Sequence, residues 1–192
     1  TKTLEKEGIA IHYKDSIDLI PGNVQNGVDG EVLIVYTPAI PDSNAQLNHL
    51  KRLYRKIFKR SEIPGLISRH KKSIAVAGTH GKTTVSTQIA HIFKQSSFDC
   101  NAFLGGISNN YNTNFLFSAN SNYMVLEADE YDRSFLQLFP EVALVTSVEP
   151  DHLDIYDDLD DVKQAFTEFA NKVPFYGAAI VCLDASEVRS IL

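Results

Sequence analysis

The order of apolar and polar positions along the chain predicts an α/β protein. Apolar runs of strand length alternate with stretches in which apolar residues recur at helical spacing. This alternation is typical of a parallel sheet that is covered by helices. In the first part of the chain the pattern predicts strands over residues 9–12, 32–37 and 56–58, and helices near 43–54 and 61–68.

A second and longer series of elements begins near residue 73. It predicts strands over 73–77, 99–104, 123–127, 142–148 and 178–183, with helices over 82–95 and 159–171 and another from about residue 186. The basic segment RHKK at 69–72 has no apolar periodicity, so we place a domain boundary after residue 70. The predicted fold is a partial Rossmann-like domain over 1–70, followed over 71–192 by a P-loop ATPase-type parallel sheet with flanking helices.

Both predicted domains are incomplete. The first opens without the glycine-rich turn of a Rossmann-like unit, and the second stops just after a helix begins. We therefore expect the chain to be a fragment of a longer protein.

Composition narrows the class of protein. The chain has 192 residues, of which 44% are hydrophobic and 22% charged, as in ordinary globular proteins. No apolar run approaches the roughly 18 residues that cross a bilayer, and residues 1–20 contain no secretory signal. Cys100 and Cys182 lack CxxC partners, which favours reduced thiols in a cytoplasmic protein. A net charge of −6 argues against nucleic acid as a partner.

The segment SIAVAGTHGKTT at 73–84 predicts a phosphate-binding loop between a strand and a helix. Gly78 and Gly81 allow a tight turn, and the N-terminus of the helix offers free N–H groups to phosphate oxygens. Lys82 is expected to reach the β and γ phosphates, and the Thr83 hydroxyl to ligate Mg²⁺. The full GxxxxGKT pattern is not met, because Val76 stands where it has its first glycine.

Acidic residues follow the predicted strand 123–127, at the sheet edge where ligands bind in doubly wound folds. We choose Glu127 as a metal ligand. For Asp129 and Glu130 a functional role and a solvated acidic loop are equally good interpretations, whereas Asp132 is assigned to a solvated loop.

The loop after the predicted strand 142–148 contains one histidine, His152, beside acidic residues. Its position favours a metal or phosphate contact, but imidazole is an unusual Mg²⁺ ligand, so chemistry alone leaves its role open. The later aspartates at 157, 158, 160 and 161 are expected to form a solvated loop and helix start. Gly105 and Gly106 allow either the close approach of a ligand or a tight turn.

Four stretches keep the order and spacing of a known family. They are VAGTHGKTT at 76–84, LEADEYDRSFL at 126–136, VTSVEPDHLDIY at 145–156 and FANKVPFYG at 169–177. They resemble the ATP-dependent Mur ligases of bacterial cell-wall synthesis. The resemblance extends more weakly to VYTPAIP at 35–41 and FKRSEIPGLI at 58–67, which are similar to the later part of that family's UDP-binding domain.

This resemblance implies a ligase that uses ATP to phosphorylate the lactyl carboxylate of UDP-N-acetylmuramate, after which the amine of L-alanine displaces phosphate. It implies that Lys82 and His152 are catalytic, that Thr83, Glu127 and His152 hold Mg²⁺, and that His80 touches the UDP-sugar. It also implies an ATP-binding loop formed by Gly78, Thr79, His80, Gly81, Lys82, Thr83 and Thr84. The family's GxGGxG turn and C-terminal half are absent, so we do not expect the chain alone to complete ligation.

Three alternatives remain. A family member that recycles wall tripeptides shares GTHGKTT and EADEYD, although the short SFLQLFPEVALV favours the alanine-using enzyme. A regulatory module could use the loop as a nucleotide switch, but would have no use for both Glu127 and His152. A small-molecule kinase would need a phosphate acceptor other than a carboxylate.

Overall fold

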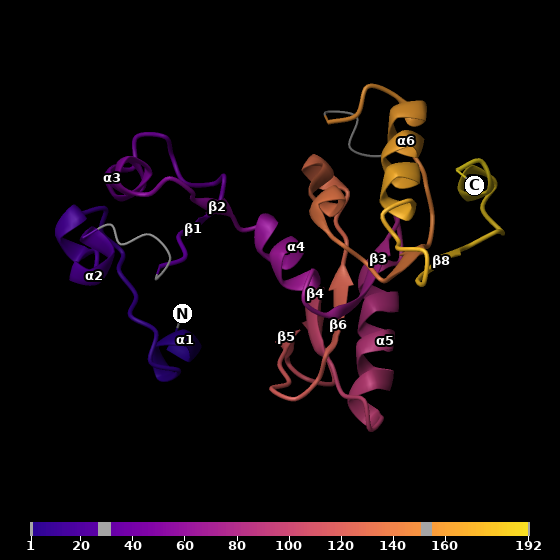
Figure 1. The fold of residues 1–192 in the computed structure, drawn as a ribbon, viewed down its shortest axis with the longest axis horizontal. Coiled ribbons are helices and arrows are strands. Elements are labelled where there is room, and N and C mark those ends of the chain that lie inside the picture. The colour runs from indigo at the N-terminus through magenta and orange to yellow at the C-terminus, as the bar shows by residue number, and fades with distance from the viewer. Residues whose placement is uncertain (1, 27–31, 151–154, 192) are drawn as a thin grey trace. The chain divides into compact units, whose positions relative to one another are not determined.

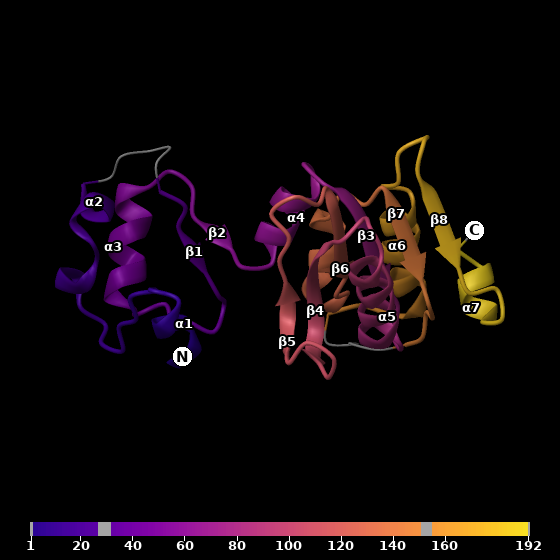
Figure 2. The same cartoon turned by 90° about the horizontal axis from the view of Figure 1, so that it is seen from below.

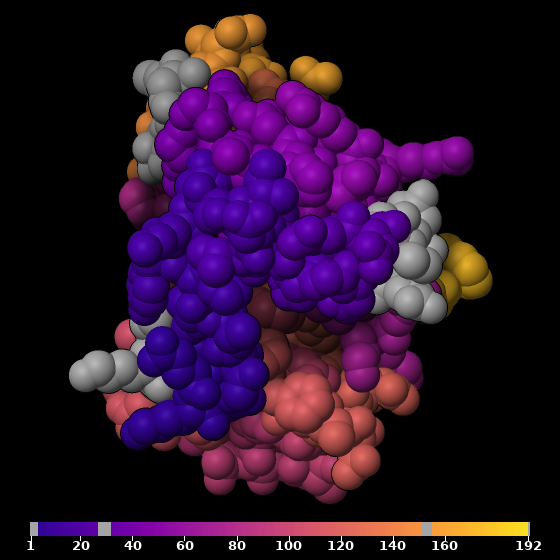
Figure 3. All heavy atoms as spheres, turned by 90° about the vertical axis from the view of Figure 1, so that its left-hand side faces the viewer, coloured from indigo at the N-terminus to yellow at the C-terminus, as the bar shows by residue number. Residues whose placement is uncertain are grey.

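The computed structural model describes residues 2–26, 32–150 and 155–191. It divides the chain into two compact units, Thr1–Arg60 and Ser61–Leu192, which are drawn as ribbons in Figure 1. The atoms of the first unit are coloured from indigo to purple in Figure 3. No helix within the described ranges is long and apolar enough to cross a membrane.

The first unit is small and mostly helical. Its two short strands pair in parallel, Val35 with Phe58 and Tyr36 with Lys59. Its elements are α1 (Lys2–Lys6), the 3₁₀ turn η1 (Ile17–Leu19), α2 (Gly22–Gln25), β1 (Val35–Tyr36), α3 (Ala45–Leu53) and β2 (Phe58–Lys59).

The start of α3 shows why this helix begins at Ala45. The Asn44 side chain accepts a hydrogen bond from Leu47 N at 2.8 Å, and the Asp15 carboxylate accepts from Ala45 N at 2.7 Å and from Gln46 N at 3.0 Å. These acceptors satisfy N–H groups that have no partner inside a helix.

The strand predicted over 9–12 is wrong. In the structure Ile9 is 49% exposed and follows a left-handed Gly8 (φ 84°), and no strand pairs with this described segment. Two alternating isoleucines are too short a pattern to hold a strand that has no neighbour.

The second unit is a six-stranded sheet flanked by helices, in the strand order β5-β4-β6-β3-β7-β8 (Figure 2). All neighbouring pairs are parallel except β4 with β5, which confirms the predicted α/β class and parallel sheet. The elements are α4 (Glu62–Ser68), β3 (Lys72–Ala77), α5 (Lys82–Gln95), β4 (Asn101–Ser108), β5 (Thr113–Leu116), β6 (Tyr123–Glu127), the 3₁₀ segment η2 (Tyr131–Gln137), β7 (Val142–Val145), α6 (Leu159–Ala170), β8 (Ala178–Val181) and α7 (Ser186–Arg189).

The central strands are buried on both faces, as a parallel sheet requires. In β6, Met124 and Leu126 pack in the core that contains Phe135 of η2 and Phe166 of α6. Val125 points the other way, into the core beneath α5. Because β3, β6 and β7 are parallel, their carboxyl ends meet at one edge of the sheet, and α5 begins there.

The predicted strands of the second unit need correction. The hairpin strand β5 was not predicted, because its residues TNFL carry only a short apolar pattern. Strand β4 begins at Asn101 rather than at 99, since Asp99 adopts a left-handed conformation (φ 50°) that cannot continue a strand. Strand β7 ends at Val145 rather than at 148.

The division between the units falls before α4, whereas the predicted boundary followed residue 70. Helix α4 packs against η2 so closely that a Cβ on Gly65 would lie 2.5 Å from Gln137 O. Ser68 is buried, and its hydroxyl accepts a hydrogen bond from Phe139 N at 3.1 Å. These contacts place α4 in the second unit.

Candidate functional site

The phosphate-binding loop predicted from the sequence lies between β3 and α5. Gly78 (φ 136°) and Gly81 (φ 81°) both have backbone conformations that side chains disfavour, and Gly81 is the residue that caps α5. The first intrahelical bond runs from Val85 N to Gly81 O. The helix geometry therefore leaves the N–H groups of the first turn directed out of the helix end, where they can bind an anion.

The end of β7 supports this loop. A Cβ on Gly78 would lie 2.0 Å from Thr146 Oγ1 and 2.9 Å from Ser147 N, so only glycine fits. Thr79 N donates to Ser147 O at 3.1 Å, and His80 N donates to Ser147 Oγ at 2.8 Å. The Thr146 hydroxyl is 2.5 Å from His80 O. The amides of Thr79 and His80 thus hold the loop, and the amides at the start of α5 are those that could bind an anion.

Lys82 extends from the first turn of α5 towards β6. Its ammonium nitrogen lies 2.8 Å from Gly78 O and 2.8 Å from Glu130 Oε1. The Lys82 side chain is 14% exposed and the Glu130 side chain 3% exposed, so this ion pair is largely shielded from solvent. Lys82 therefore stands at the loop, as the sequence predicts, and its carboxylate partner is Glu130, whose role the sequence left open.

Thr83 and Glu127 are brought together at the carboxyl end of β6. Thr83 Oγ1 donates to Glu127 Oε1 at 3.0 Å, and Gly105 N donates to Glu127 Oε2 at 2.8 Å. A Cβ on Gly105 would lie 2.0 Å from Glu127 Oε1, so this glycine makes room for the carboxylate. Gly106 faces Thr83 instead, since its Cβ would lie 3.3 Å from Thr83 Cγ2.

The donor atoms here fit a magnesium ion. A threonine hydroxyl and a carboxylate are the hard oxygen ligands that Mg²⁺ takes, often from only one or two side chains together with phosphate and water oxygens. The third predicted metal ligand, His152, lies outside the described residues. Within the described part of the chain, no group of three or more His, Cys, Asp or Glu side chains could hold a metal ion.

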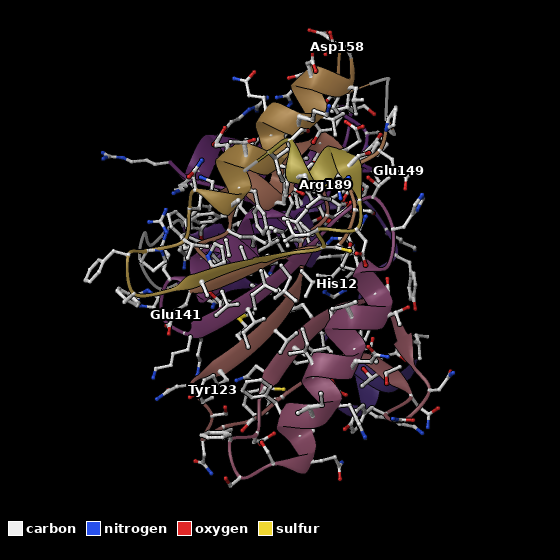
Figure 4. All side chains as sticks on the ribbon, turned by 90° about the vertical axis from the view of Figure 1, so that its right-hand side faces the viewer. His12, Tyr123, Glu141, Glu149, Asp158 and Arg189 are labelled. Atoms are coloured by element: carbon white, nitrogen blue, oxygen red, sulfur yellow. The ribbon has the colours of Figure 1, made fainter. Side chains whose placement is uncertain are left out.

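His80 occupies the exposed side of the loop. Its Nε2 lies 3.5 Å from Glu149 Oε2, with both side chains more than half exposed. The backbone N–H of Glu149 donates a hydrogen bond to Thr79 Oγ1 at 2.9 Å, and this bond connects the loop after β7 to the loop between β3 and α5. Glu149 is labelled in Figure 4. His80 is therefore free to meet a ligand from solvent, but it does not contact Lys82, Thr83 or Glu127 among the interactions described.

The other acidic residues separate into two kinds. Asp129 and Asp132 are exposed, and Asp129 Oδ1 accepts from Tyr131 N at 3.2 Å. Glu130 is buried at the site itself. Farther along, Asp158 caps α6 by accepting from Asp161 N at 2.9 Å, at the helix end labelled in Figure 4. That helix start agrees with the expectation for the later aspartates.

A tyrosine and an arginine fix the backbone around Glu130. Tyr156 OH donates to Glu130 O at 2.7 Å, and burial raises the pKa of the Tyr156 phenol to about 12, so it remains a donor. The Arg133 guanidinium lies 4.7 Å from the centre of the Tyr156 ring and pairs with Asp161. Asp132 and Arg133 are both left-handed (φ 53° and 58°), a strained arrangement that surrounding contacts must hold.

The sequence-based reasoning missed three of the residues that build this site, Thr146, Ser147 and Tyr156, and left the role of Glu130 open. A signal for the first two was present, because polar residues directly after the apolar run VALV come at the carboxyl end of a strand, beside the loop. No pattern indicated Tyr156, whose role depends on tertiary packing.

Comparisons with known proteins point to one family. A model of the Mur ligase middle domain matches residues 76–192. A UDP-N-acetylmuramate–L-alanine ligase of Porphyromonas gingivalis is 46% identical over 181 residues, which are 94% of this chain and 39% of that relative. A ligase of the same name from Cytophaga hutchinsonii is 44% identical over 187 residues, or 96% of this chain and 40% of the relative. The chain thus spans 39% to 40% of the length of these relatives.

Solved structures share the fold. UDP-N-acetylmuramate-alanine ligase MurC from Thermotoga maritima matches with a TM-score of 0.77 at 25% identity, covering 99% of this chain and 42% of that one. UDP-N-acetylmuramate:L-alanyl-gamma-D-glutamyl-meso-diaminopimelate ligase from Neisseria meningitides matches with a TM-score of 0.78 at 21% identity, covering 100% of this chain and 62% of that one. The second likeness shows the fold alone.

A parallel α/β sheet with a glycine loop at a helix N-terminus is the architecture of the nucleotide-binding class of α/β proteins. The family model covers more than half of the chain, and the relatives align along nearly all of it. The chain belongs to the Mur ligase family.

Proposed function

We propose that this chain is part of an ATP-dependent ligase that joins L-alanine to the lactyl carboxylate of UDP-N-acetylmuramate through an acyl phosphate. The observation that carries the proposal is the 46% identity to a UDP-N-acetylmuramate–L-alanine ligase along 94% of the chain. Because that relative is much longer, the activity belongs to a whole protein of which this chain supplies the phosphate site.

In this proposal the loop from Gly78 to Thr84 binds the ATP phosphates. The N–H groups at the start of α5 and the Lys82 ammonium donate to phosphate oxygens. Thr83 and Glu127, which lie 3.0 Å apart, would hold Mg²⁺, and His152 a second Mg²⁺. The bound metal would neutralise phosphate charge.

The charge at the site suits transfer of a phosphoryl group to a carboxylate. A carboxylate oxygen attacks the γ phosphorus, the bond to ADP breaks, and an acyl phosphate forms; the amine nitrogen then attacks the acyl carbon, phosphate leaves and the nitrogen loses a proton. Without cations the carboxylate and the polyphosphate would repel each other. Lys82 supplies one of the positive charges that reduce this repulsion.

Residues 1–70 would contribute part of the UDP-sugar site, and the exposed His80 would face that substrate. The γ phosphate would lie at the carboxyl ends of β3 and β6, which is where open α/β sheets bind ligands.

Calorimetric titration of the chain with ATP and Mg²⁺ tests the phosphate site. Lys82→Ala should weaken binding at least tenfold, because a charge-assisted contact to phosphate is lost. Lys94→Ala is the matched control: it removes the same charge from the other end of α5, where Lys94 pairs with Asp99, and should change affinity less than about twofold. Undiminished MgATP binding by folded Lys82→Ala would refute the phosphate-loop assignment.

Phosphate release by the full-length protein tests the reaction. Release should require UDP-N-acetylmuramate and L-alanine together, and should cease in Lys82→Ala. Release with an intact wall tripeptide but not with L-alanine would assign the recycling reaction instead. Nucleotide binding without any amine-dependent release would favour a regulatory module.

A further inference from the structure

The Lys82–Glu130 ion pair is not explained by phosphate binding alone. A lysine ammonium has three donors, and in this structure two of them point to Gly78 O and Glu130 Oε1, each at 2.8 Å. The carboxylate is 3% exposed, so water screens its charge weakly. The positive charge that the loop offers to phosphate is therefore largely neutralised by a buried negative charge.

Glu130 is fixed in place and cannot easily follow Lys82. Its carbonyl accepts from Tyr156 OH at 2.7 Å, and Tyr156 is itself almost completely buried. The following residues, Asp132 and Arg133, have strained left-handed backbones, and Arg133 is anchored both by Asp161 and by the Tyr156 ring. When Lys82 moves towards a phosphate, its contact with Glu130 must weaken.

We propose that Glu130 sets the nucleotide affinity of the loop by sharing the Lys82 ammonium with the phosphates. Glu130 is a positioning residue: it acts on the nucleotide through Lys82 and keeps binding weaker than an unshared Lys82 would make it. Weaker binding favours release of ADP after each reaction cycle. This inference rests on the proposed function, because it requires that Lys82 contacts the phosphates.

Glu130→Gln is the informative variant. Glutamine keeps the shape, and its amide oxygen can still accept from Lys82, but the negative charge is gone. Charge-assisted hydrogen bonds are roughly twice as strong as neutral ones, so Lys82 should turn to phosphate more readily. We expect MgATP to bind about tenfold more tightly, together with a lower melting temperature when no nucleotide is added, because a buried ion pair has been lost.

The opposite signs of these two effects separate the proposal from a merely structural role, which would lower both stability and affinity. Asp129→Asn is the matched control: it removes the same charge one residue away, from an exposed side chain with no described contact to Lys82, and should change affinity less than about twofold. Should Glu130→Gln fail to fold, Glu130→Asp carries the test, with an expected tightening of about threefold because the shortened side chain lengthens the contact.

The experiment is calorimetric titration of the chain with MgATP and with MgADP, alongside thermal unfolding without nucleotide. Unchanged or weaker nucleotide binding by a folded Glu130 variant would overturn the proposal, as would equal tightening in Asp129→Asn. If the wild type binds MgATP and Lys82→Ala does not, those outcomes refute this inference alone. If the wild type binds no MgATP, or if Lys82→Ala binds it as tightly as the wild type, the proposed function itself fails.

Discussion

Gly105→Ala tests whether the position of Glu127, rather than its presence alone, makes the metal site. The added methyl group would lie 2.0 Å from Glu127 Oε1 and 2.4 Å from Oε2, so the carboxylate must move. The backbone of Gly105 is not left-handed, and the clashing atoms are the far end of a flexible side chain. The strand should therefore survive the substitution while the carboxylate leaves Thr83.

The expected magnitudes differ for stability and for metal binding. The carboxylate would lose hydrogen bonds from Gly105 N and Thr83 Oγ1, but it is partly exposed and can bind water instead, so we expect a net loss of about 1 kcal/mol. Alanine has fewer conformations than glycine in the unfolded chain, and this difference restores about 0.4–1 kcal/mol of the lost stability. A change of up to about 1 kcal/mol lowers the melting temperature by only a few degrees. Displacing an oriented metal ligand typically weakens metal affinity about 10- to 100-fold.

The assay is nucleotide affinity measured over a range of Mg²⁺ concentrations, with thermal unfolding as the check on folding. Gly105→Ala should need about 10- to 100-fold more Mg²⁺ for tight ATP binding, and Glu127→Gln should behave similarly. Gly106→Ala is the control, since its methyl group would meet only Thr83 Cγ2 at 3.3 Å. Wild-type Mg²⁺ dependence in folded Gly105→Ala would refute Glu127 as a ligand held in this geometry.

Three further predictions concern the stability of the loop, the reactivity of the two thiols and the dependence of stability on pH. Gly78→Ala should destabilise the chain by at least about 2 kcal/mol in urea unfolding, because position 78 has a positive φ and the added methyl group would overlap the end of β7. A methyl group on Gly81 would lie 4.0 Å from Thr146, so Gly81→Ala should cost only the backbone strain of about 1–2 kcal/mol. Iodoacetamide should modify the exposed Cys182 in the folded chain but Cys100 only after unfolding, since burial raises the pKa of the Cys100 thiol to about 11; mass spectrometry locates the label. The pKa of Asp99 is lowered to about 2 by its lysine partner, so its contribution to stability is present above about pH 4 and is lost as the pH falls towards 2. Because Asp99 is partly exposed, Asp99→Asn should remove less than about 1 kcal/mol of this acid-sensitive stability, measured as the difference between unfolding free energies at pH 5 and pH 2.

The parts of the fold that the sequence predicted are those set by local patterns. Strands β3 and β6 and helices α5 and α6 lie where their apolar periodicity places them, because each is long enough to bury a continuous face. Residues of the loop were equally predictable, since Gly78 and Gly81 are needed by backbone geometry that is local to the turn.

The parts that could not be predicted depend on contacts between distant segments. Strand β5 forms because β4 offers it an edge, and the segment 9–12 fails to form a strand because no described neighbour pairs with it. Glu130 and Asp129 are adjacent acids in the same motif, yet one is 3% exposed beside Lys82 and the other faces solvent. The backbone of Glu130 also accepts a hydrogen bond from Tyr156, a contact with a distant segment that the residues EADE alone do not indicate.

The strand order β4-β6-β3-β7 explains why glycines and polar residues from separate motifs depend on each other. Gly105 on β4 leaves space for Glu127 of the adjacent β6, and Gly78 after β3 leaves space for Thr146 after the adjacent β7. In both cases a polar side chain from the neighbouring strand or the loop after it occupies the space that a side chain at the glycine would need. A glycine in one motif and a polar residue in another are therefore coupled. Enlarging Gly105 should displace the Glu127 carboxylate while the strand stays folded, and a smaller residue at position 127 should remove the overlap at the expense of the magnesium ligand.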